Sequence, residues 1–90
     1  MYKTLKRRDV FAIVRECAVN SPAAKASFQR SAVDERTKFS DLGISSETDI
    51  IALCYDIERR IGYKARRERV SSITPNTSIG EAVDVFHVDY

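Results

Sequence analysis

The stretch Phe39–Ser46, with the sequence Phe-Ser-Asp-Leu-Gly-Ile-Ser-Ser, is the part of the chain that decides the fold. Apolar residues stand on both sides of a glycine, and two serines follow at the start of an amphipathic run. Serine is among the residues preferred at a helix N-cap, because its hydroxyl accepts a backbone N–H of the first turn. The stretch therefore predicts a turn at Gly43 and a helix that either Ser45 or Ser46 caps.

The residues after the two serines form the clearest helical pattern of the chain. Apolar side chains recur at the spacing i, i+3, i+4, i+7 and i+11, which is typical of one buried helix face. Acid in the first turn and arginine in the last suit the helix dipole, and Gly62 is a typical helix end. A second, smaller apolar pair, Ile51 and Tyr55, lies off this face. The pair either flanks the core or binds a partner.

Three further helical segments are expected. The first covers about Thr4–Ala18 and ends before Asn20-Ser21-Pro22, since proline and the residue before it resist helical geometry. A short one covers Arg66–Ser71. Ser78 and Glu81 form a capping box for the last helix. No segment alternates as a strand would, so we predict an all-α fold of three longer helices and one short one, with a long loop after the first.

The long connection between the first two longer helices, residues 23–41, is expected to be anchored in the core by Val33 and Phe39. Its first part, Ala23–Ala32, has good helix formers and predicts a short helical turn that docks Phe28. The predicted core consists of the apolar faces of the helices and of the Phe39 turn: Val10, Ile13, Val14, Cys17, Phe39, Leu42, Ile50, Leu53, Cys54, Ile57, Ile61, Ile79, Val83 and Phe86.

Size and composition favour one small domain that spans residues 1–90. Of the 90 residues, 43% are hydrophobic and 31% charged, which is typical of a globular chain. No apolar run approaches the ~20 residues that span a bilayer, and the N-terminus lacks a signal sequence. We therefore expect a cytoplasmic monomer without membrane contact. Cys17 and Cys54 are expected to be buried free thiols, and with the single His87 they supply no metal site.

The charged residues divide by sign along the second half of the chain. Every charge from Asp41 to Glu58 is acidic, and Arg59–Arg69 carries six basic residues against one acid. The two runs are either solvated helix surfaces or adjoining fields that orient a charged partner. Nucleic-acid binding through the arginines is a further class, which the adjoining acid and the absence of an evident recognition helix disfavour. The purpose of the basic segment stays open.

Taken in order, these features resemble the acyl carrier protein family. Phe39-Ser-Asp-Leu42-Gly43-Ile44 is similar to the Phe-x-x-Leu-Gly-x part of that family's motif, which continues as Asp-Ser-Leu. Ile57-Glu-Arg-Arg-Ile-Gly-Tyr63 resembles the Leu-Glu-x-x-Phe-Gly end of the family's second helix. Ile73-Thr-Pro-Asn-Thr-Ser-Ile-Gly-Glu-Ala-Val83 resembles the start of its last helix. The match covers nearly the whole chain in order, and implies a small four-helix bundle of acyl-carrier-protein type.

The centre of the family motif differs in this chain. Counted forward from Gly43, Asp-Ser-Leu becomes Ser45-Ser46-Glu47, so Ser46 stands at the attachment position. Counted backward from Ile57 and Ile61, Glu47 stands there instead, which implies one extra residue before Ile50. The aspartate before the serine and the leucine after it are absent in either alignment.

The resemblance implies a specialised acyl carrier without catalytic residues of its own. A phosphopantetheine arm would be attached to Ser46, with Ser45 as the second candidate. Its partners would be a phosphopantetheinyl transferase and acyl-transferring or condensing enzymes of fatty-acid, polyketide or secondary-metabolite biosynthesis. The alternative is a carrier-like interaction module without the prosthetic group, which binds a protein through the second helix. The predicted partner-binding residues are Glu47, Asp49, Ile51, Tyr55 and Glu58.

An enzyme is not expected from this sequence. The chain has one histidine, His87, and no nucleophile has a base in sequence range. It also lacks a glycine-rich phosphate loop.

Overall fold

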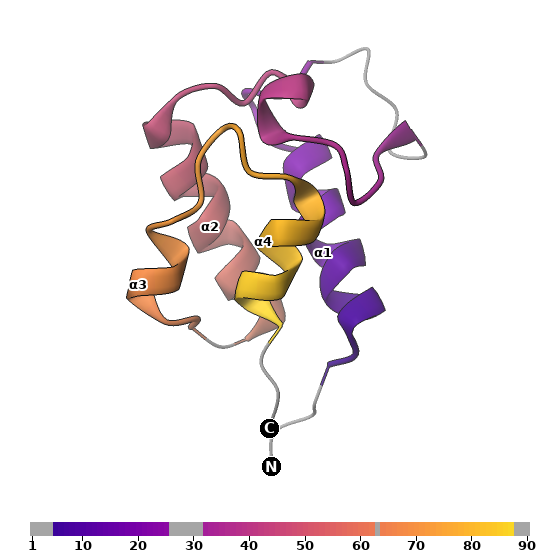
Figure 1. Ribbon diagram of the computed structural model, residues 1–90, viewed down its shortest axis with the longest axis vertical. Helices are drawn as coiled ribbons and strands as arrows, with labels where there is room; N and C mark the ends of the chain where they lie inside the picture. Colours follow the sequence, from indigo (N-terminus) through magenta and orange to yellow (C-terminus); the bar gives the residue numbers. More distant parts are fainter. Residues whose placement is uncertain (1–4, 26–31, 63, 88–90) are drawn as a thin grey trace.

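The structure is a computed structural model that describes residues 5–25, 32–62 and 64–87. Within these ranges it is all-helical, as predicted, with no strand and one isolated antiparallel bridge between Lys38 and Ser78. No helix there is long and apolar enough to cross a bilayer. Figure 1 shows the elements, which are α1 (Arg7–Val19), the 3-10 helix η2 (Phe39–Leu42), α2 (Glu47–Ile61), α3 (Arg67–Val70) and α4 (Ile79–Phe86).

The predicted helices are present, with small differences at their ends. The first helix begins at Arg7, while the expected start at Thr4 lies outside the described residues. The turn predicted at Gly43 is preceded by η2, which was not expected as a helix. The short turn expected to dock Phe28 also falls outside the described ranges.

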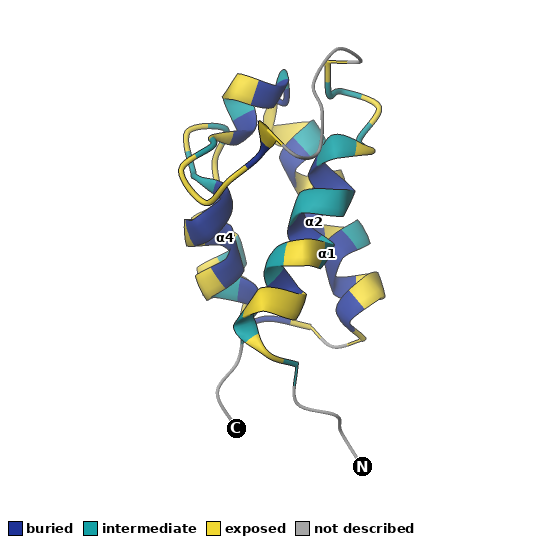
Figure 2. Ribbon diagram, turned by 90° about the vertical axis from the view of Figure 1, so that its right-hand side faces the viewer, coloured by how far each residue is buried: buried dark blue, intermediate teal, exposed yellow. Residues whose placement is uncertain are grey.

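The core lies between α1, α2 and α4, whose buried residues face one another in Figure 2. Every predicted core residue is buried except Ile13, which is half-buried at the edge of the face that Val10 and Val14 form. Helix α3 packs against α4, lies across a groove from α2 and contributes no fully buried residue. The core also contains the expected loop anchor Val33 and five apolar residues outside the predicted list: Ala18, Ile44, Ala65, Ile73 and Ala82.

The long connection is bound to the start of α4 by backbone hydrogen bonds. The N–H of Ile79 donates to the carbonyl of Thr37 at 2.8 Å, and the N–H of Gly80 donates to that of Glu35 at 2.9 Å. A Cβ at Gly80 would lie 3.0 Å from the Cβ of Glu35 and 3.1 Å from its carbonyl oxygen, so this close approach favours glycine. Val33 is buried in the core, at 3% exposure, as predicted.

The capping box predicted at α4 is formed. The Ser78 hydroxyl accepts the N–H of Glu81 at 3.2 Å, and the Glu81 carboxylate accepts the N–H of Ser78 at 3.0 Å. This backbone donor is the main reason why the pKa of Glu81 lies below its ordinary value of 4.5.

Truncation of Leu53 tests the orientation of α2. We expect Leu53→Ala to lower the free energy of unfolding by about 2–5 kcal/mol, because it leaves a cavity in the core. Ile51→Ala on the same helix is the matched control, because Ile51 is 56% exposed. Urea unfolding measures both variants. Equal losses of unfolding free energy in Leu53→Ala and Ile51→Ala would show that α2 is rotated differently from this structure.

The capping box at α4 gives the protein a dependence of stability on pH. A carboxyl whose pKa is lowered by folding contributes stability that is present above its unfolded pKa and is lost as the pH falls through the folded value. We therefore expect Glu81→Gln to reduce the difference in urea midpoint between pH 7 and pH 3. If the urea midpoint of Glu81→Gln changed between pH 7 and pH 3 as much as that of the unsubstituted chain, the role of the Glu81 carboxylate would be contradicted.

Candidate functional site

The turn before α2 is locked by Gly43 and Ile44. Gly43 has φ of 100°, in the left-handed region, and a Cβ there would meet the Ala23 carbonyl and the Lys25 side chain at 3.0 Å. Glycine is therefore required at this position for both its conformation and its size. The N–H of Ile44 donates to the carbonyl of Phe39 at 3.0 Å, and its side chain is fully buried. The chain consequently reaches the start of α2 in a defined direction.

Ser46 is the N-cap of α2, which decides between the two serines for this role. Its hydroxyl oxygen accepts the N–H of Asp49 at 3.1 Å, and α2 begins at the next residue, Glu47. Ser45 and Ser46 are both exposed. At Ser46 the hydroxyl is thus oriented by a helix and remains open to solvent.

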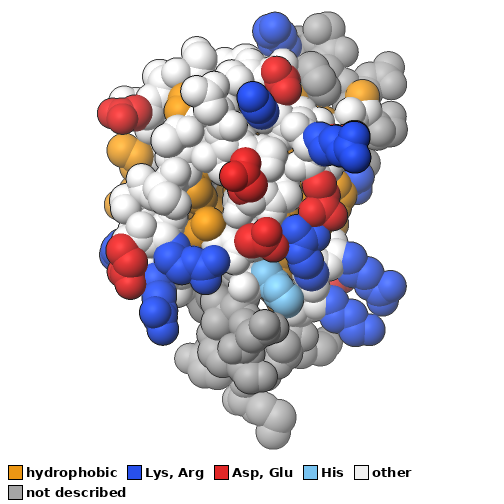
Figure 3. Space-filling model, viewed as in Figure 1, with side chains coloured by type: hydrophobic (Ala, Val, Ile, Leu, Met, Phe, Trp, Pro, Cys, Tyr) orange, Lys and Arg blue, Asp and Glu red, His pale blue; other side chains and the backbone are white. Residues whose placement is uncertain are grey.

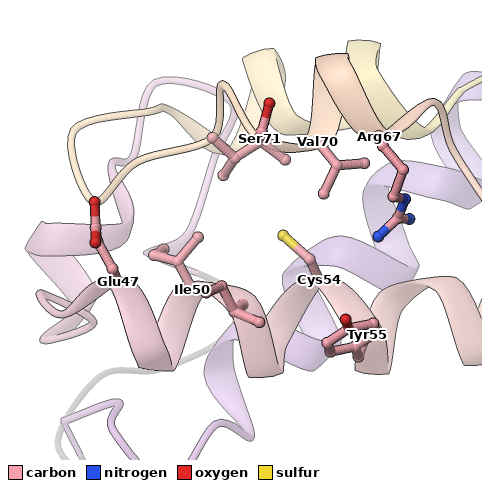
Figure 4. A pocket seen from close by; sticks show the side chains of 9 residues that line it. Glu47, Ile50, Cys54, Tyr55, Arg67, Val70 and Ser71 are labelled. Atoms are coloured by element: carbon pink, nitrogen blue, oxygen red, sulfur yellow. The ribbon is translucent and has the colours of Figure 1, made fainter.

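A groove of about 420 Å³ runs between α2 and α3 and begins one residue after Ser46. Figure 4 shows the side chains of both helices facing this space. The walls are mainly apolar, with a carboxylate near one end and a guanidinium near the other. They are formed by Glu47, Ile50, Ile51, Cys54, Tyr55, Arg67, Val70, Ser71 and Ile73.

Ile51 and Tyr55 lie on the outer rim of the groove. They are 56% and 59% exposed and are the exposed large hydrophobic residues of the described chain. The sequence left open whether this pair flanks the core or binds a partner, and in the structure both side chains face solvent. Glu47 is exposed and Asp49 half-buried in the adjacent first turn. Acidic and apolar side chains thus share one accessible surface of α2.

Glu58 does not belong to that surface, and its prediction as a partner-binding residue is corrected. It is only 6% exposed, because its carboxylate points inward and accepts the N–H of Ala65 at 2.9 Å. The same oxygen, Oε2, pairs with the guanidinium of Arg67. A signal for this burial exists in the sequence, since Glu58 follows Cys54 by four residues and precedes Ile61 by three.

Three arginines of the basic segment make contacts within the molecule. Arg67 pairs with Glu58, Arg59 pairs with Asp56 at 3.0 Å, and Arg69 donates to the carbonyl of Asp84 at 3.1 Å. Figure 3 shows Lys and Arg side chains gathered at the lower left, around α3. Part of this segment therefore serves to fix α3 and the end of α2.

The two cysteines are free and buried, as predicted. Burial is the main cause that raises the pKa of Cys17 to about 12 and that of Cys54 to about 11. Both thiols are therefore protonated near neutral pH. Among the described residues, no group of His, Cys, Asp or Glu side chains could hold a metal ion.

In comparisons with protein-family models, curated proteins and solved structures, nothing matches this chain. Function is therefore inferred from the start of α2, from the groove beside it and from the order of the sequence motifs.

Removal of the Ser46 hydroxyl tests the cap. We expect Ser46→Ala to lower the free energy of unfolding by about 1 kcal/mol, since the N–H of Asp49 loses its acceptor. Ser45→Ala is the control, because Ser45 caps no helix, and its urea midpoint should match that of the unmodified chain. A larger loss of unfolding free energy in Ser45→Ala than in Ser46→Ala would show that Ser45, and not Ser46, caps α2.

Proposed function

We propose that this protein is a specialised acyl carrier, a four-helix bundle of acyl-carrier-protein type that carries acyl groups on a phosphopantetheine arm at Ser46. The observation that supports this most is the exposed Ser46 hydroxyl, held at the start of α2 beside the mouth of an apolar groove. A carrier needs no catalytic group of its own. It needs an accessible nucleophile at a defined position and a surface that partner enzymes can bind.

The residues around Ser46 fit a phosphodiester. Helix N-termini favour phosphate, because unpaired backbone N–H groups and the helix dipole both point toward it. Phosphate oxygens could accept the Asp49 N–H in place of the hydroxyl. The carboxylate of Glu47, next in sequence, opposes the added negative charge. When bound, the arm supplies a terminal thiol that holds an acyl group as a thioester.

Attachment requires only the Ser46 hydroxyl from this chain. The Ser46 oxygen attacks the β-phosphorus of coenzyme A, a new oxygen–phosphorus bond forms, and the pyrophosphate bond breaks to release adenosine 3′,5′-bisphosphate. The hydroxyl proton passes to a base of the transferase. Because Ser46 Oγ accepts its hydrogen bond from Asp49, its proton remains available for this transfer.

Partner enzymes are proposed to bind the accessible surface of α2. Glu47 and Asp49 suit a basic partner surface, and Ile51 and Tyr55 supply apolar contact area beside them. The transferase and the acyl-transferring or condensing enzymes would share this surface. Glu58 contributes nothing to it because of its burial.

The intact mass after incubation with coenzyme A and a broad-specificity phosphopantetheinyl transferase tests the proposal. We expect the mass of one phosphopantetheine to be added to the chain without substitutions and to Ser45→Ala, and no addition to Ser46→Ala. Circular dichroism establishes that the variants are folded. A gain lost only in Ser45→Ala would place the arm at the other serine. Absence of any gain, also in protein from the native host, would exclude a phosphopantetheine carrier.

A second candidate function is a protein-interaction module without a prosthetic group. The exposure of Ile51 and Tyr55 favours it, because large apolar side chains on a small surface commonly mark a binding site. In this case Ser46→Ala would retain full partner binding, and Ile51→Ser with Tyr55→Ser would abolish it.

A further inference from the structure

The position of helix α3 depends on one buried side chain, that of Glu58. It comprises four residues, Arg67–Val70, and none of them is buried. A helix this short has little stability of its own, because a single turn forms too few hydrogen bonds to offset the conformational entropy lost in nucleating it. The chain on either side of it is anchored by Ala65 and Ile73, which are 5% and 7% exposed. Within the segment, Val70 is half-buried against the core, and the remaining contacts that hold it are polar.

The principal contact is with Glu58, the buried charged residue of the described chain. One carboxylate oxygen accepts the N–H of Ala65 at 2.9 Å and the guanidinium of Arg67. Arg67 also donates to the carbonyl of Ala65 at 3.4 Å. Glu58 thus connects the end of α2 to the start of α3 through both backbone and side chain. Within the described part of the chain, the other polar contact from α3 to a helix is the exposed bond that Arg69 donates to the backbone carbonyl of Asp84.

The position of α3 also determines how open the groove is. Arg67 and Val70 form its α3 wall, and Ile50 and Cys54 lie opposite on α2. In Figure 4 the sulfur of Cys54 points into the space between the helices, toward α3. Cys54 is nevertheless only 4% exposed. Displacement of α3 would therefore uncover this thiol and the apolar floor around it.

We propose that the Glu58–Arg67 ion pair is a latch that holds α3 in place beside the end of α2, and that its release lets α3 move and uncovers Cys54. Removing one partner of a buried ion pair is costly because the other charge stays buried, so the closed state depends on both residues. Local opening of a short, weakly packed element needs less free energy than global unfolding. Glu58 is a positioning residue here, and the latch does not require a prosthetic group on Ser46.

Labelling of Cys54 with N-ethylmaleimide reports the opening, with Cys17 as an internal reference for unfolding of the whole chain. Cys17 is 1% exposed in the core and lies away from the groove lining. The rate at each cysteine is obtained by mass spectrometry of peptides after timed labelling. We expect labelling of Cys54 to be about tenfold or more faster in both Glu58→Gln and Arg67→Gln, with the Cys17 rate unchanged.

The two variants separate opening from a direct electrostatic effect on the thiol. Burial first, and then the Glu58 carboxylate, raise the pKa of Cys54 to about 11, whereas Arg67 lowers it. Without opening, Glu58→Gln would speed labelling and Arg67→Gln would slow it, because only the thiolate reacts. Faster labelling in both variants is therefore expected only if α3 moves.

Charge-matched controls are available on the same elements. Glu68→Gln removes an exposed carboxylate from α3, and Arg59→Gln breaks the exposed ion pair with Asp56 on α2. Neither should change the Cys54 rate by more than about twofold, because exposed pairs contribute little. Slower or unchanged labelling in Arg67→Gln would overturn the latch. A parallel rise at Cys17 would also overturn it, by showing that the pair stabilises the whole fold.

Discussion

Burial of one face of α2 in the core determines where every other side chain of that helix points. Ile50, Leu53 and Ile57 are at most 4% exposed, and rotation of the helix by one residue would expose all three. With this face inward, Ile51 and Tyr55 must face solvent. The orientation also directs Glu58 toward α3 and Cys54 into the groove. The accessible surface, the groove and the buried ion pair are consequences of a single packing constraint.

The two ends of α2 have different roles. At its start, Gly43 and Ile44 fix the approach of the chain, and Ser46 presents a hydroxyl beside acidic side chains. At its end, the basic segment begins, and its contacts with Glu58 and Asp84 hold α3 in place. The division of charge along the sequence thus separates a surface suited to binding from a region engaged in internal structure. The sign of the basic segment is explained in part by the buried carboxylate that it neutralises.

The groove links the two proposals without making one depend on the other. An arm on Ser46 would start at the groove's mouth, and an acyl chain on that arm would find an apolar space to enter. The latch concerns access to the same space and would operate equally if a partner protein supplied the apolar group.

Much of the fold was determined by local signals in the sequence. Apolar periodicity located α1, α2 and α4, and the two serines Ser45 and Ser46, Gly62 and the Ser78 capping box located helix ends, because caps depend on residues only a few positions apart. The core residues follow from the same periodicity, although Ile44 and Ala65 escaped it because they lie outside the regular helices.

Tertiary structure alone decided what the candidate site contains. From the sequence, the spacing of Glu58 from Cys54 places it near the buried face of α2 but gives it no partner, and Arg67 is one more member of a basic run. Only packing brought them together from two helices and placed the carboxylate against the N–H of Ala65. The groove likewise needs two helices from separate parts of the chain. Such features depend on the relative position of elements in space, which helical periodicity and capping do not encode.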